Sequence, residues 1–170
     1  MTWKNSGILI LGLILAIFWI AAGQADDIGS LPMPRDKLYV EECGACHTAY
    51  APGFLPARSW VRMMGELERH FGEDASLDEP QSLAIQRYLT DLAADSQNGT
   101  PFMRRLAASV PARAAPQRIT ETWFFAYMHD EVPASFWTRK KIGTKANCIA
   151  CHPRANAGSY AEREVSIPPP

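Results

Sequence analysis

Two copies of the five-residue pattern Cys-x-x-Cys-His constrain this chain more than any other feature. They occupy residues 43–47 and 148–152 and use all four cysteines of the 170-residue sequence. Because residues i and i+3 of a helical turn share one face, both sulfurs can form thioethers with the vinyl groups of a haem, and the next residue, His, can reach the iron. The sequence therefore predicts two covalent haems c, attached through Cys43, Cys46, Cys148 and Cys151, with His47 and His152 as iron ligands.

Cys-x-x-Cys pairs also occur in other metal and redox sites. Such a pair can form a redox disulfide or half of a zinc site, and the four cysteines and four histidines of this chain would suffice for a tetrahedral zinc cluster. Neither site needs a histidine directly after the second cysteine, and here that histidine occurs twice. The repeated pattern favours haem over zinc and over dithiol chemistry.

The N-terminal segment has the composition of an export signal. One basic residue, Lys4, precedes an uncharged run rich in Ile and Leu over residues 7–23, and a small-x-small exit follows at Gly23-Gln24-Ala25. This pattern predicts a cleaved signal peptide over residues 1–25. The apolar run also reaches the short limit for a membrane-spanning helix, so an uncleaved N-terminal anchor is the alternative. In both cases we expect the rest of the chain to be periplasmic.

The exported part is predicted to be mainly α-helical, with two haem-binding lobes of short helices and long loops. Ser96-Gln97-Asn98-Gly99 is the clearest internal boundary, and it separates a first lobe, residues 26–95, from a second lobe, residues 96–170. No stretch shows sustained strand alternation. Apolar periodicity and helix-end residues predict helices over residues 35–46, 57–71, 78–94, 102–109, 120–129, 135–141 and 144–151.

Charge is unevenly distributed along the chain. Residues 26–95 carry 13 acidic and 6 basic side chains, net −7, whereas residues 96–170 carry 5 acidic and 10 basic ones, net +5. Ordinary solvated surfaces can produce such a division. An electron carrier can also use it, because complementary fields raise encounter rates and fix orientation. A basic cluster before the second haem motif can equally neutralise haem propionates; it consists of Arg139, Lys140, Lys141 and Lys145.

Only two histidines lie outside the two motifs, His70 and His129. Each lies among aromatic and apolar residues, and each haem iron has a second axial position to fill. One spare histidine per haem predicts bis-histidine ligation. Closeness in the sequence pairs His70 with His47. The same argument pairs His129 with His152, and a crossed pairing is the alternative. The competing sixth ligands are Met63, Met64, Met103 and Met128.

This ligation predicts an electron carrier. Two protein ligands on each iron leave no open position for oxygen, peroxide or substrate, so the chain should shuttle single electrons and not act as an enzyme. Histidine in place of methionine predicts low-potential haems, since His/Met ligation raises the potential. The alternatives are a haem enzyme or gas-binding protein with one five-coordinate haem, peroxidase-like or a sensor, and a haem subunit of a larger membrane complex.

Several longer runs are shared with a known family. The most specific is Leu55-Pro56-Ala57-Arg58-Ser59-Trp60 followed by His70-Phe71-Gly72, and Arg118-Ile119-Thr120-Glu121-Thr122 adds to it. With the two motifs, nearly all of the exported chain resembles the bacterial periplasmic dihaem cytochromes c. The resemblance implies a small electron-transfer protein with two low-spin, bis-histidine haems. In the typifying case the acceptor is an oxygen-binding monohaem cytochrome, the sphaeroides haem protein, and the implied donor is a membrane cytochrome b.

Overall fold

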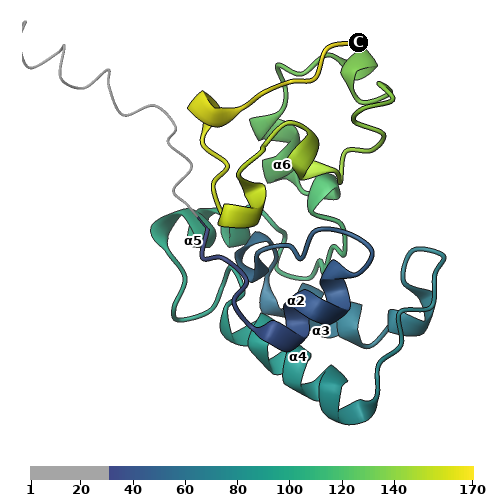
Figure 1. Cartoon of the computed structure of the whole chain (residues 1–170). Coiled ribbons are helices and arrows are strands. Elements are labelled where there is room, and N and C mark those ends of the chain that lie inside the picture. Colours follow the sequence, from purple (N-terminus) through teal and green to yellow (C-terminus); the bar gives the residue numbers. More distant parts are fainter. Residues whose placement is uncertain (1–30) are drawn as a thin grey trace, which may run out of the picture.

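The computed structural model describes residues 31–170, so the predicted leader, residues 1–25 with its apolar run 7–23, lies outside the described residues. Over residues 31–170 the regular structure consists of five α-helices and seven short 3-10 turns, without a strand (Figure 1). This confirms the predicted mainly α class. No helix in this part of the chain has the length and apolar character needed to cross a membrane.

Three helices pack together in the lower part of Figure 1: α2 (Lys37–Gly44), α3 (Ala57–Met64) and α4 (Glu79–Asp91). The carboxylates of Asp36 and Asp78 accept hydrogen bonds from first-turn backbone N–H groups of α2 and α4, which fixes where these helices begin. α3 packs along α4, and their apolar faces form one core cluster with residues from α2 and a loop. The buried members are Tyr39, Leu55, Trp60, Met64, Ile85, Leu89 and Ala93.

A second core cluster brings together distant parts of the chain. It surrounds α5 (Pro101–Ala108), which begins after the capping residue Thr100. This helix contacts η1 (Pro52–Phe54). Its buried members are Leu31, Ala51, Ala94, Phe102, Met103, Leu106, Ala155 and Tyr160. These residues come from both sides of the predicted boundary between residues 95 and 96. The division into two lobes remains a prediction. Residues from both predicted ranges form this one core cluster.

The predicted helix over residues 57–71 is wrong in its second half. α3 ends at Met64, and a 3-10 turn, η2 (Leu67–Arg69), follows it. Gly65 lies at the break, where its low helix propensity weakens the helix. Farther on, Phe71 has a φ of 54°, a left-handed conformation that a right-handed helix cannot contain. His70 therefore lies at the start of a turn and not on the face of a helix.

The helices predicted over residues 135–141 and 144–151 are also wrong. The structure has only the 3-10 turns η4 (Ala134–Phe136) and η5 (Cys148–Ala150) there. Hydrogen bonds from nearby side chains replace the backbone hydrogen bonds of a helix. The Thr144 hydroxyl accepts from the backbone N–H of Ala146, and the Asn147 side-chain amide donates to the backbone carbonyl of Ile142. The remaining predicted ranges overlap α2, α4, α5 and α6 (Trp123–Met128), with differences at the ends.

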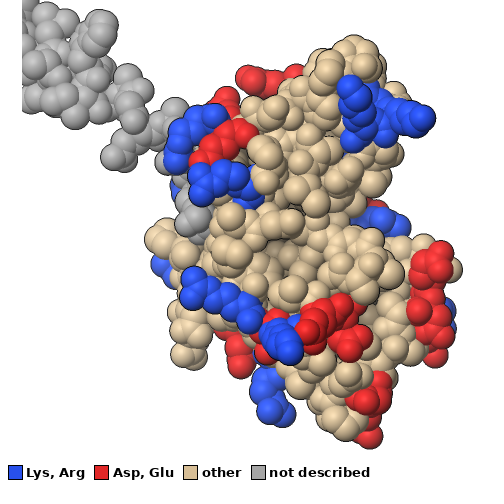
Figure 2. All heavy atoms as spheres, viewed as in Figure 1, with Lys and Arg blue, Asp and Glu red and all other residues tan. Residues whose placement is uncertain are grey.

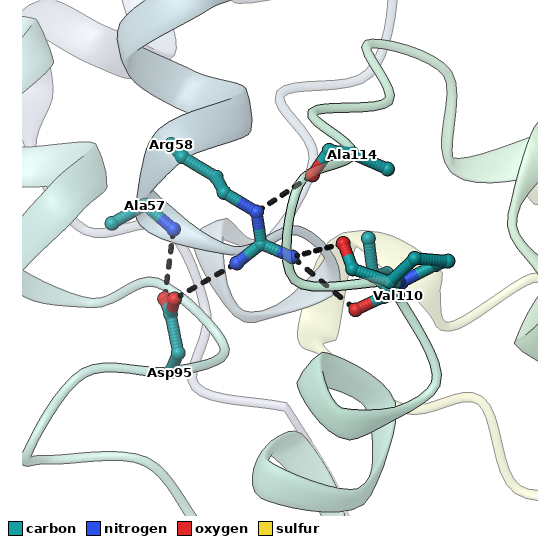
Figure 3. Close-up of polar contacts among 6 residues, drawn as sticks. Ala57, Arg58, Asp95, Val110 and Ala114 are labelled. Carbon is teal, nitrogen blue, oxygen red and sulfur yellow. Dashed lines mark hydrogen bonds and ion pairs between the residues drawn. The ribbon is translucent and has the colours of Figure 1, made fainter.

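Arg58 joins α3 to the connector that follows α5. Its guanidinium donates to three connector carbonyls at distances of 2.6 to 3.3 Å, those of Val110, Pro111 and Ala114. Its remaining nitrogen lies 3.5 Å from a carboxylate oxygen of Asp95 (Figure 3). The connector is therefore fixed along the first helices of the chain, because one planar cation binds carbonyls that have no partner within a helix.

Candidate functional site

The structure brings the four histidines together as two pairs. The ring centroids of His47 and His70 are 6.1 Å apart with an interplanar angle of 24°. Those of His129 and His152 are also 6.1 Å apart, with an angle of 81°. The structure thus places together the residues that closeness in the sequence paired.

The separation within each pair suits one iron between two imidazoles. A metal–nitrogen bond is about 2 Å long and a ring nitrogen lies about 1 Å from its centroid, so two imidazoles on opposite sides of one iron have centroids roughly 6 Å apart. Both pairs have this separation. In residues 31–170, which include every cysteine and histidine, no three His, Cys, Asp or Glu side chains gather as a metal-binding group. The zinc cluster considered from the sequence is not assembled there.

A backbone carbonyl orients one histidine of each pair. Nδ1 of His129 lies 2.8 Å from the carbonyl oxygen of Phe125, and Nδ1 of His47 lies 2.8 Å from that of Thr48. Because a carbonyl only accepts, Nδ1 carries the hydrogen and donates it. Nε2 then keeps its lone pair, which is the arrangement typical of metal-bound histidines.

Burial favours the neutral form of three of these imidazoles. It lowers the pKa of His70, with smaller contributions from the neighbouring His47 and from Arg118. It likewise lowers the pKa of His152, next to His129. At His129 burial also lowers the pKa, against the opposing hydrogen bond to the Phe125 carbonyl. Neutral imidazole is the form that binds a metal, so all three are ready to act as ligands.

Both motifs partly bury their first cysteine and differ at their second. Cys43 lies at the end of α2 and Cys148 begins η5, and burial raises the pKa of each thiol to about 11. The second cysteine is more open in the first motif, where Cys46 is exposed, than in the second, where Cys151 is half-buried. The four cysteines form no disulfide in the described chain, so every thiol is available for covalent attachment.

Aromatic side chains surround the second histidine pair. Phe125 stacks on His129 with centroids 4.1 Å apart, and Trp137 lies 5.7 Å from the same ring. Tyr160 lies 5.5 Å from His152. A pocket of about 250 Å³ adjoins His129, and Phe125, Trp137 and the basic side chain of Lys145 are among its lining residues. This environment offers apolar surfaces and one cation to a flat group that carries carboxylates.

The sequence anticipated only part of this environment. Of the aromatic residues on α6, Phe125 lies against His129, whereas Trp123 and Tyr127 stack on each other and are 63% and 55% exposed. The sequence did not indicate that Trp137 and Tyr160 belong to this site. Their aromatic character near the second motif was the available signal, but nothing in the spacing shows that they reach its histidines.

The competing methionine ligands are mostly part of the core. Met64 and Met103 are 7% and 1% exposed and belong to the two core clusters, and Met63 packs against one of them. Met128 is the last residue of α6 and directly precedes His129. Three of the four methionines therefore have an apolar packing role in the structure.

Known proteins share the sequence pattern and the fold of this chain. A family model described as dihaem cytochrome c matches residues 39–160, which include both motifs and all four histidines. A solved dihaem cytochrome c from Rhodobacter sphaeroides is 41% identical, with a TM-score of 0.66 over 75% of this chain and 98% of that one. A dihaem cytochrome c structure from Shewanella baltica OS155 is 36% identical, with a TM-score of 0.64 over 80% of this chain and 95% of that one. A search of curated proteins found no match.

Proposed function

This chain belongs to the dihaem cytochrome c family, whose two covalent haems c make it a haem-based electron-transfer protein, and we propose that two histidines bind each of its haem irons. His47 and His70 are the ligands of one iron, and His152 and His129 those of the other. The observation that carries this assignment is the centroid separation of 6.1 Å in both pairs. The thioether-forming residues are Cys43, Cys46, Cys148 and Cys151.

The side chains around each site orient and close it. When bound, each haem supplies the one-electron couple of its iron. The carbonyls of Phe125 and Thr48 hold His129 and His47 in the tautomer that presents Nε2. Two imidazoles leave no position for a substrate, so the protein carries electrons and does not catalyse a reaction by itself. Two histidine ligands on each iron would also favour low reduction potentials.

We place this electron transfer in the periplasm, between a membrane or soluble donor and a redox partner. The resemblance supports an oxygen-binding monohaem cytochrome as acceptor and a membrane cytochrome b as donor. Surface charge offers a means of recognition: Figure 2 shows acidic side chains gathered at the lower right of the view, over the start of α4 and the loop before it. Partners with basic surfaces would be steered there.

Carbon monoxide tests the ligation directly. We expect sharp low-spin bands for the dithionite-reduced holoprotein, and no change in these bands when carbon monoxide is added, because neither iron has a free or weakly held position. The measurement is the visible spectrum before and after addition. A shift in about half of the haem absorbance would contradict the proposal, since it would reveal one open haem and favour a gas-binding or peroxidase-like function.

A further inference from the structure

One tyrosine connects the two haem motifs. The ring of Tyr50 stacks on that of His47 in the first motif, with centroids 5.1 Å apart and an interplanar angle of 25°. Its hydroxyl donates a hydrogen bond of 2.8 Å to the backbone carbonyl of Ala146, 96 residues away in the sequence and two residues before Cys148. A single side chain thus contacts an iron ligand of one site and the backbone that leads into the other.

Both ends of this connection are well defined. The Ala146 carbonyl also accepts from the backbone N–H of Cys148 at 3.0 Å, so the tyrosine hydroxyl and the cysteine share one acceptor. At the other end, the carbonyl of Tyr50 accepts a 2.7 Å hydrogen bond from the hydroxyl of Tyr39, which is buried in the α2–α4 core. Tyr50 is therefore held from the core of the first helices and reaches the second motif.

The backbone before the second motif has no other long-range hydrogen bond in the described chain, and its long-range packing is at its end, where Cys148 contacts the core cluster around α5. Residues 144–148 form no α-helix, and their other hydrogen bonds in the described chain join residues at most five positions apart. The hydroxyl of Tyr50 supplies the long-range bond that ties this segment to the first motif.

We propose that Tyr50 is a positioning residue that fixes the second haem motif relative to the first and so sets the path over which electrons pass between the two irons. The proposal rests on the proposed function, which supplies the two haems and their ligands. In an electron transfer between the two sites, one iron is oxidised and the other is reduced, and the tyrosine is neither oxidised nor reduced. Its ring maintains the contact with His47, and its hydroxyl fixes the segment that ends at Cys148.

The test is Tyr50→Phe in the holoprotein, because this change keeps the ring and removes only the hydroxyl. Losing one hydrogen bond lowers the equilibrium constant for the hydrogen-bonded arrangement by roughly two- to tenfold. We therefore expect a broader iron–iron distance distribution by pulsed electron paramagnetic resonance, and electron exchange between the haems slowed by about twofold or more after flash reduction. Both haems should remain low-spin and unreactive to carbon monoxide, since no iron ligand is changed.

Tyr88→Phe is the matched control, because it also removes a tyrosine hydroxyl that takes part in a hydrogen bond, here with the backbone N–H of Arg35, and leaves the bond to Ala146 in place. We expect it to preserve the distance distribution and the exchange rate. The proposal is overturned if Tyr50→Phe leaves both quantities unchanged, or if Tyr88→Phe alters them as much, which would indicate general loosening of the fold. Failure of the proposed function is separate: it appears as carbon monoxide binding by the unmodified protein, whatever the iron–iron distance.

Discussion

His129→Ala should convert one haem of this protein to a high-spin form that binds carbon monoxide, and leave the other haem low-spin. The alanine cannot bind iron, and His129 is the nearest imidazole to His152, with ring centroids 6.1 Å apart. Phe125 and Trp137 would then face an open position on the iron. Visible spectra with and without carbon monoxide would show the change in about half of the haem absorbance, and His70→Ala should do the same at the other haem.

Met128→Leu is the matched control for this prediction, since it changes the neighbouring residue on α6 and removes a competing sulfur ligand. Its spectrum should equal that of the unmodified protein. Magnetic resonance would also test the pairing: signals of the His152 ring should shift in His129→Ala, whereas those of His47 should not. Unchanged spectra in both histidine variants would refute the ligand assignment, and a shift of the His47 signals would favour the crossed pairing.

Arg58→Ala should lower the free energy of unfolding by about 3 kcal/mol, because hydrogen bonds to a charged group contribute about 1.5 kcal/mol or more each. The guanidinium binds three connector carbonyls and the carboxylate of Asp95. The expected loss is smaller than the sum of the separate bonds because the side chain is 33% exposed and its ion pair is partly screened. Denaturant unfolding of the holoprotein, followed by circular dichroism, measures the change.

Arg58→Lys is the appropriate comparison. Lysine keeps the charge, but its single ammonium group cannot reach three carbonyls and a carboxylate in the fixed geometry of a guanidinium. We therefore expect it to recover less than half of the lost stability. Equal stability of the lysine variant and the unmodified protein would mean that charge alone matters, and a loss below about 1 kcal/mol in Arg58→Ala would mean that the connector is held by other contacts.

The haem motifs were easier to recognise in the sequence than the course of the backbone around them. Counting was sufficient to find two motifs and two spare histidines, and apolar periodicity over residues 78–94 predicted α4 well. The helix predicted over residues 57–71 was too long because apolar residues continue at helical spacing past Gly65. The chain turns there, and Phe71 adopts a positive φ. Periodicity records which residues are apolar and contains no information on where the backbone reverses.

Long-range polar contacts could not be predicted from the sequence for a different reason. The partners of Arg58 are backbone carbonyls, and every residue type has a carbonyl, so nothing at positions 110, 111 or 114 marks them as acceptors. The same holds for Ala146, which meets Tyr50 across 96 residues of sequence. Such contacts follow from the folded path of the chain and cannot be recognised from local composition.

The core cluster around α5 bears on how this protein assembles. It buries Ala51 and Ala94 from the N-terminal range together with Ala155 and Tyr160 from the C-terminal range, so neither range alone can complete it. We therefore expect the molecule to unfold as a single cooperative unit. A chain cut at residue 95 would expose an unfinished core, so its first haem site should not persist as an independent cytochrome. We expect the two sites to be gained and lost together.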